Sequence, residues 1–153
     1  MTSIKFSEKI RIQKKQEEVF DYTQDYQNRL SWDTFLQKAI LIEGATEAGL
    51  GIKSYCEAKN GLGMVTEYVS FRRPKVVAIN MTKGPYMFRS FLGSWNFHHM
   101  GEDQTEVIFL YSFSLRFPFY LFGWFIRWRL KTNVRHRLLD LKNCLEQTSD
   151  SIS

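Results

Sequence analysis

The residues best suited to acid–base chemistry are two adjacent histidines and two tyrosines in the strand-rich part of the chain. Histidine titrates near neutral pH, so His98 and His99 are candidates for a general acid or base. Neighbouring strand residues point to opposite faces, so only one of the pair can enter an interior. If His99 does so, it joins Tyr111 and Tyr68 as a set for proton transfer in an aldol-type cyclisation. The competing interpretation is a solvated histidine beside the turn at 101–103.

A second group of residues has the types that line and orient a ligand in an apolar pocket. Such a pocket needs a few convergent polar groups among aromatic and aliphatic walls. The polar candidates are Arg89, Tyr68, Tyr111, His99 and Arg127. The full set of predicted cavity residues is Tyr55, Met64, Tyr68, Arg89, Phe91, Trp95, Phe97, Phe109, Tyr111, Phe113, Trp124 and Arg127. For each aromatic residue, packing in an ordinary core is the alternative interpretation.

Several other chemistries find no support in the residue spacing. The chain has no close ligand pair of the i, i+4 or C-x-x-C kind, so we predict no metal and no cofactor. A G-x-S-x-G nucleophile elbow is missing. Gly49-x-Gly51 and Gly61-x-Gly63 open no helix, so they predict turns rather than phosphate loops. The basic residues follow no nucleic-acid-binding motif, and we expect no nucleic-acid partner.

Length and composition indicate one domain over residues 1–147, followed by a polar tail at 148–153. The 153 residues are 44% hydrophobic and 16% aromatic, with a net charge of +5. The first ten residues contain no apolar signal-peptide core, and the longest apolar run is about half of a bilayer span. We therefore expect a cytoplasmic protein. Cys56 and Cys144 are expected as free thiols rather than a disulfide.

The candidate residues must be positioned by a chain of strands bracketed by helices. Alternation of apolar and charged residues predicts a half-buried strand from Ile4 to Ile12. Helical spacing of Val19, Phe20 and Tyr22 predicts a helix that ends near Asp25, with a second short helix over Tyr26–Trp32. Turn residues then delimit six strands at Leu36–Glu43, Ile52–Ala58, Met64–Phe71, Val76–Thr82, Tyr86–Met100 and Glu106–Leu115. Short connections between consecutive strands make them antiparallel neighbours.

The C-terminal segment combines aromatic residues with cations. Seven of the fourteen residues Phe117–Leu130 are aromatic, and no acid occurs from Val107 to Leu139. One stripe of the predicted helix faces a sheet, namely Gly123, Ile126, Leu130, Val134, Leu138, Leu141 and Leu145. A second aromatic face remains unassigned and consists of Leu121, Trp124, Phe125 and Trp128. It indicates a contact with a membrane or with a second copy of the chain.

The order of elements resembles the helix-grip fold of the START/Bet v1-like (SRPBCC) superfamily, and within it the polyketide cyclase/dehydrase and lipid-transport family. The residues that carry the resemblance are Val19-Phe20-Asp21-Tyr22 with Asp25, Trp32-Asp33, Gly93-x-Trp95-x-Phe97, and 103–107 as a partial match to the Gly-Thr-x-Val turn. The resemblance implies an α+β fold. In this fold, a curved antiparallel sheet of six to seven strands wraps around the long C-terminal helix. A deep apolar cavity lies between the sheet and that helix, and two short helices gate it.

Three functions are compatible with this fold. The first is binding or transport of a hydrophobic small molecule or lipid without catalysis. The second is a polyketide cyclase/dehydratase or aromatase, for which His99 and Tyr111 are the candidate catalytic residues. The third is peripheral contact with an anionic membrane through the aromatic and basic face of the last helix, which is compatible with the first. We expect a monomer or a weak homodimer.

Overall fold

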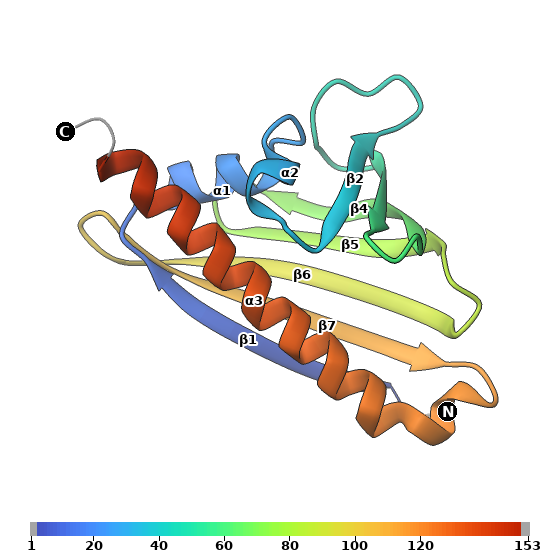
Figure 1. The fold of residues 1–153 in the computed structure, drawn as a ribbon. Coiled ribbons are helices and arrows are strands. Elements are labelled where there is room, and N and C mark those ends of the chain that lie inside the picture. Colours follow the sequence, from blue (N-terminus) through green and yellow to red (C-terminus); the bar gives the residue numbers. More distant parts are fainter. Residues whose placement is uncertain (1–2, 151–153) are drawn as a thin grey trace.

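The fold is a curved antiparallel sheet whose concave side is covered by one long helix (Figure 1). The computed structural model describes residues 3–150. Its elements are β1 (Ile4–Ile12), α1 (Gln16–Gln24), α2 (Arg29–Trp32), β2 (Leu36–Leu41), β3 (Lys53–Ala58), β4 (Gly63–Arg72), β5 (Val76–Lys83), β6 (Phe88–Gly101), β7 (Gln104–Leu115), η1 (Phe119–Phe122) and α3 (Gly123–Asp150). The predicted α+β helix-grip fold is confirmed.

The sheet has seven strands in the order β1-β7-β6-β5-β4-β3-β2, and each neighbouring pair is antiparallel. The first strand therefore joins the last, while β2 forms the opposite edge. Register shifts interrupt the pairing within β4–β5 and β6–β7. Such bulges increase strand twist and bend, which helps the sheet to curl around α3.

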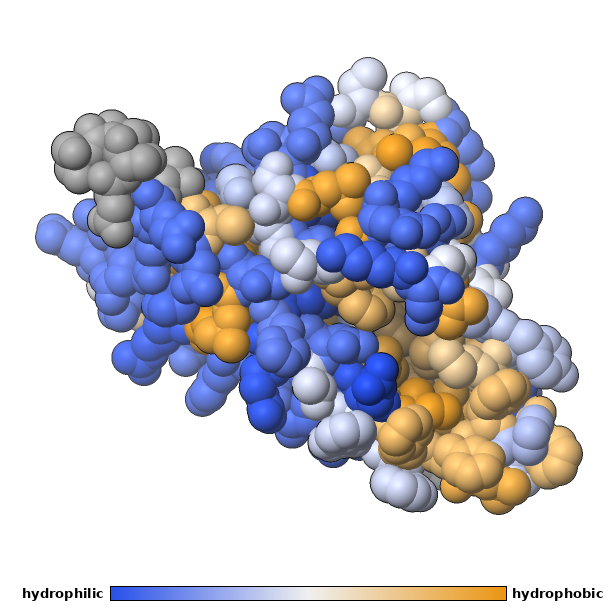
Figure 2. Space-filling model, viewed as in Figure 1, coloured by the Kyte–Doolittle hydropathy of each residue, from blue (hydrophilic) through white to orange (hydrophobic). Residues whose placement is uncertain are grey.

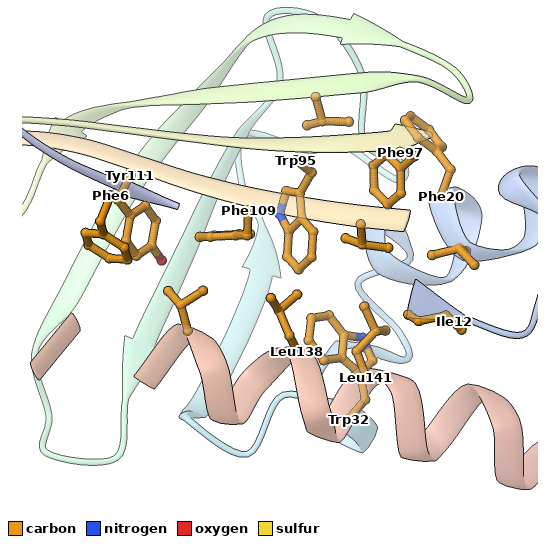
Figure 3. Close-up of a cluster of buried hydrophobic side chains, with 14 of the residues drawn as sticks. Phe6, Ile12, Phe20, Trp32, Trp95, Phe97, Phe109, Tyr111, Leu138 and Leu141 are labelled. Carbon is orange, nitrogen blue, oxygen red and sulfur yellow. The ribbon is translucent and has the colours of Figure 1, made fainter. Parts of the chain in front are cut away.

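Helix α3 packs its apolar stripe on the sheet, as its residue spacing predicts. Val134, Leu138, Leu141 and Leu145 are buried, whereas Leu139 on the other side of the helix is exposed. Figure 3 shows Leu138 and Leu141 pointing toward the aromatic rings of β6 and β7. Trp95 and Phe109 meet edge to face with ring centroids 4.3 Å apart. Burial of this apolar stripe stabilises the packing of α3 on the sheet through the hydrophobic effect.

The two short helices connect β1 to β2 at one end of α3 (Figure 1). The Asp25 carboxylate accepts a hydrogen bond from the Gln27 backbone N–H at 3.0 Å and another from the Asn28 amide at 2.9 Å. This local turn separates the two helices. Helix α2 therefore begins at Arg29, whereas the prediction placed its start at Tyr26. At the other end, α3 continues to Asp150 and includes the first residues of the predicted tail, while 151–153 lie outside the described residues.

Candidate functional site

A cavity of about 510 Å³ lies between the curved sheet and α3. Its size falls within the range of roughly 300–1,000 Å³ that is usual for small-molecule sites. Side chains from α1 and α2, from strands β2 to β7 and from α3 contribute to its wall. Much of the wall is aromatic or aliphatic and includes Met64, Val77, Ile79, Met87, Phe88, Phe91, Trp95, Phe109, Ile126 and Leu130. The space therefore suits an apolar body.

Half of the predicted cavity residues are found in this wall. They are Met64, Tyr68, Phe91, Trp95, Phe109 and Tyr111. They come from β4, β6 and β7. Figure 3 shows Trp95 of β6 and Phe109 of β7 on the side of the sheet that faces the helix. Gly93 faces the same way, and a Cβ there would lie 3.0 Å from the Tyr111 ring. Its missing side chain therefore leaves room for that ring.

Two predicted residues, Phe97 and Phe113, are buried but lie outside the cavity. Phe97 packs edge-on against Phe20 of α1, with ring centroids 5.2 Å apart. Phe113 packs against Phe88 at 5.8 Å. Both are core residues because neighbouring aromatic rings fill the space in front of them.

Tyr55 and Arg89 were also predicted to line the cavity, but their side chains lie on the face of the sheet that points away from it. Ser54 and Cys56 line the cavity, so Tyr55 between them points away from it and its hydroxyl donates to Glu57 at 2.7 Å. Arg89 is exposed on β6. A register shift between Phe88 and Ser90 changes the alternation there, so that Phe88 and Phe91 both point inward.

The structure places three further predicted residues, Trp124, Arg127 and His99, outside the cavity wall. Trp124 is 75% exposed. Arg127 donates its Nε–H to the Lys5 carbonyl oxygen at 3.2 Å and does not line the cavity. His99 is exposed and pairs with Thr105 beside the β6–β7 turn. The predicted set of His99, Tyr111 and Tyr68 is therefore not assembled, since only the tyrosines line the cavity.

The dominant polar feature is a buried cluster of Arg29, Asp33 and Arg137. The Asp33 carboxylate accepts hydrogen bonds from Arg29 Nε at 2.9 Å, from Arg137 Nε at 3.0 Å and from Arg137 Nη2 at 2.9 Å. Arg137 Nη1 also donates to the Tyr111 hydroxyl at 2.9 Å. The cluster thereby ties α2 to α3 and to β7, with both arginines in the cavity wall and Asp33 behind them.

Burial and charge act in opposite directions on these groups. Burial by itself would raise the pKa of Asp33, but the charges and hydrogen bonds of Arg137 and Arg29 lower it. Burial likewise opposes the charged form of Arg137, yet Asp33 and Tyr111 together raise its pKa. For Arg29, Asp33, Cys56 and Tyr26 together outweigh burial, so its pKa is also raised. All three groups are charged at neutral pH.

A second polar group lies on the wall formed by α1, β3 and β4. The hydroxyls of Tyr26 and Tyr68 are 2.9 Å apart, and Tyr68 donates to Gln24 Oε1 at 2.8 Å. Burial raises the pKa of Tyr26 and raises that of Tyr68 well above its usual value. Burial also raises the pKa of Cys56. The hydroxyls and the Cys56 thiol therefore keep their protons at neutral pH.

The sequence contains a signal for the arginine cluster. Arg29 and Asp33 have the i, i+4 spacing of a helical ion pair, and Arg137 falls beside the apolar stripe of α3. A charged residue on a buried face needs a partner of opposite charge. Asp33 is that partner for Arg137, but the two residues are 104 positions apart in the sequence, so local spacing does not indicate their contact.

An exposed aromatic surface adjoins the cavity at the start of α3. We call it the aromatic end and define it as Phe117, Tyr120, Leu121, Phe122, Trp124, Phe125 and Trp128, all of which are exposed. Figure 2 shows apolar residues gathered over η1 and the first turns of α3. Phe125 belongs to the aromatic end and also lines the cavity. The cation Arg129, one helical turn further along α3, lines the cavity too. None of the helices in the described part of the chain is long and apolar enough to cross a membrane.

Solved structures with this architecture come from several bacteria. The Zhui aromatase/cyclase from a Streptomyces species superimposes with a TM-score of 0.82, at 10% identity over 95% of each chain. A Thermus thermophilus protein reaches a TM-score of 0.80, at 16% identity, with 95% of this chain and 99% of that chain covered. A START superfamily protein from Mycobacterium smegmatis has a TM-score of 0.78, at 11% identity over 94% and 98% of the two chains. At these identities the likeness establishes the fold.

No curated protein matches the sequence. The sequence pattern of one family does match, and it covers residues 3–146, which is nearly the whole chain. The seven-stranded sheet, the cavity and the covering helix agree with that match. The chain therefore belongs to the polyketide cyclase / dehydrase and lipid transport family.

Proposed function

We propose that the protein binds a hydrophobic small molecule or lipid in the cavity between the sheet and α3, and that it carries this ligand without converting it. The observation that supports this function best is the cavity of about 510 Å³ with its aromatic and aliphatic wall. Burying apolar surface of a ligand against such a wall provides about 25 cal/mol per Å². The polar groups in the wall suit orientation of a ligand.

A cavity-filling substitution tests this proposal. Leu130 lines the cavity, whereas Leu139 on the same helix is exposed. We expect purified protein to bind 1-tetradecanol in native mass spectrometry. Leu130→Trp should weaken binding by about tenfold or more, equivalent to about 1.4 kcal/mol. Leu139→Trp should leave it unchanged. A wild-type protein that takes up no alcohol, or a Leu130→Trp variant that binds as well as wild type, would contradict the proposal.

The cyclase or dehydratase alternative requires an acid–base group in the cavity. The exposed position of His99 weakens this alternative. The phenols of Tyr26 and Tyr68 and the Cys56 thiol have raised pKa values, so they are poor bases at neutral pH. Tyr111 remains as the candidate catalytic residue, held by Arg137. Turnover of a polyketide-like substrate that is abolished by Tyr111→Phe would favour the enzyme over the carrier.

Our second proposal is that the aromatic end docks on an anionic membrane, where the ligand enters or leaves. Exposed apolar patches of this kind mark interaction sites, and Trp and Tyr favour the membrane interface. The flanking charges are all positive, with Arg116, Arg127, Arg129 and Lys131 beside the aromatic residues and no acid from 107 to 139. This combination fits acidic lipid headgroups. The shared position of Phe125 connects the docking surface to the cavity.

Vesicle flotation tests the docking proposal. We expect the protein to float with vesicles that contain phosphatidylserine and much less with pure phosphatidylcholine. Replacing Trp124 and Trp128 together by Ala should remove most of the bound fraction. Leu50→Ala is the control, because Leu50 is also an exposed apolar residue but lies far along the chain from the aromatic end. Binding that ignores acidic lipid content, or a concentration-dependent dimer that buries Trp124, would overturn this proposal.

A further inference from the structure

The charged side chains of the cavity wall all have the same sign. In the described part of the chain they are Arg29, Lys59, Arg129 and Arg137. No carboxylate belongs to the wall, since Asp33 is fully buried behind the two inner arginines. A ligand that enters the cavity therefore meets only positive charges, and two of them are buried.

Of the two buried cations, Arg29 uses less of its hydrogen-bonding capacity than Arg137. Its side chain is only 8% exposed, and its single hydrogen bond with the described residues runs from Nε to Asp33. The guanidinium otherwise lies against the rings of Trp32 at 5.0 Å and Tyr26 at 5.9 Å. The terminal Nη1 and Nη2 groups carry four N–H donors, and none donates to an acceptor in residues 3–147. These donors belong to a side chain that lines the cavity.

Arg137, unlike Arg29, uses its terminal amino groups for hydrogen bonds within the protein. It holds Asp33 through two parallel hydrogen bonds and Tyr111 through a third. This bidentate pair neutralises the Asp33 charge. The charge of Arg29 consequently has no carboxylate of its own, and the cluster carries one net positive charge.

A buried excess charge is costly unless a partner compensates it. The cavity offers space for such a partner beside Arg29. A planar carboxylate matches the fork of a guanidinium and can accept two parallel hydrogen bonds. A single negative charge also matches the one net positive charge of the buried cluster of Arg29, Asp33 and Arg137.

We propose that the ligand is a monocarboxylate with an apolar body, and that its carboxylate binds to the terminal amino groups of Arg29. This inference rests on the proposed function, because it concerns the same cavity. The apolar body would extend along α3 from Arg137 toward Ile126, a distance of about 16 Å at 1.5 Å per helical residue. Phe88, Phe91 and Leu130 are the apolar residues that would cover it.

Calorimetric titration with two probes of the same length tests this assignment. The probes are tetradecanoic acid and 1-tetradecanol, which differ only in the headgroup. At neutral pH we expect wild-type protein to bind the acid about tenfold or more tighter than the alcohol, as for a charge-assisted bidentate pair. In Arg29→Gln this preference should vanish while the alcohol affinity persists. The Asp33–Arg137 pair remains intact in this variant, so the fold should be retained.

Arg127→Gln serves as the matched control, because Arg127 belongs to the same basic region but lies outside the cavity. Equal binding of acid and alcohol by wild type, or an acid preference that survives in Arg29→Gln, would overturn the carboxylate assignment and leave the carrier function standing. Tighter binding of tetradecyl phosphate than of the acid would also overturn it. Failure of both the acid and the alcohol to bind would overturn the carrier function, and this inference with it.

Discussion

At the residue scale, the decisive feature is the buried carboxylate of Asp33 between two arginines. Removing an isolated charge from water costs several kcal/mol, and close partners must compensate for that cost. Asp33 obtains three hydrogen bonds from Arg29 and Arg137, all of about 3 Å. The same contacts link α2 to α3, so one side chain both stabilises the fold and positions the cations of the cavity.

Asp33→Asn should strongly destabilise the protein. The substitution leaves two buried guanidinium groups without a carboxylate, and breaking a buried pair in this way costs about 3–5 kcal/mol. Urea unfolding followed by circular dichroism measures the loss. The control is Asp21→Asn, since Asp21 pairs with Arg73 at the surface and its removal should cost less than about 1 kcal/mol. Similar losses in the two variants would contradict the role given to Asp33.

Stability should also depend on acid pH through Asp33. Its pKa is lower in the folded protein than in the unfolded chain, where it is about 3.9, so the unfolded state binds the proton more readily. The stabilisation is therefore complete above about pH 4 to 5 and is lost as the pH falls through the folded pKa. Unfolding at a series of pH values should show this decline in wild type and a shallower one in Asp33→Asn. Parallel pH profiles would refute the assignment.

At the scale of the element, α3 works as two successive segments. Its later turns are ordinarily amphipathic, and Val134, Leu138, Leu141 and Leu145 are buried on the sheet. Its first turns carry apolar residues on both sides, with Ile126 and Leu130 in the cavity wall and Trp124 and Trp128 in solvent. The later turns thus anchor the helix, while the first turns are available for ligand and surface contacts.

Leu141→Ala and Leu139→Ala should separate the anchoring face from the outer face. Leu141 is completely buried, and removal of its side chain should lower the free energy of unfolding by about 3 kcal/mol. Leu139 is two residues away and exposed, so its replacement should change stability by less than about 0.5 kcal/mol. Thermal unfolding of both variants measures the difference. Equal effects would mean that α3 does not pack as described.

At the scale of the whole molecule, the cavity and the aromatic end lie at the same part of the fold. The cavity lies between the sheet and α3, and Figure 1 shows the helix crossing the concave side of the sheet. The aromatic end covers η1 and the start of α3, where Figure 2 shows an apolar surface, and its residue Phe125 also lines the cavity. A net charge of +5 adds a long-range attraction to anionic surfaces. Proximity of the two sites would let a ligand pass between a membrane and the cavity.

Vesicle binding should accordingly respond to ionic strength. Raising NaCl from about 0.1 M to about 1 M shortens the Debye length from about 10 Å to about 3 Å, which screens the basic residues. The fraction of protein that floats with phosphatidylserine vesicles should fall steeply over this range. A purely hydrophobic contact would be insensitive to salt or strengthened by it, and that outcome would contradict the electrostatic part of the docking proposal.

The order of elements could be read from the sequence because it depends on local patterns. Alternation of apolar residues marks a strand, and turn residues mark where one strand ends and its antiparallel neighbour begins. These rules located each strand to within a few residues. The stripe from Val134 to Leu145 followed from helical periodicity in the same way. The family resemblance then indicated that the helix covers the sheet and leaves a cavity.

Which side chains reach the cavity was decided only by the tertiary structure. A register shift near Phe88 reversed the alternation, so that Phe88 replaced Arg89 in the wall. Phe97 has the inward orientation but meets Phe20 from another element. Arg29, Asp33 and Arg137 lie up to 108 positions apart in the sequence, yet they form one ion cluster. Periodicity records which face a residue occupies, whereas burial and charge pairing depend on what the distant chain brings against that face.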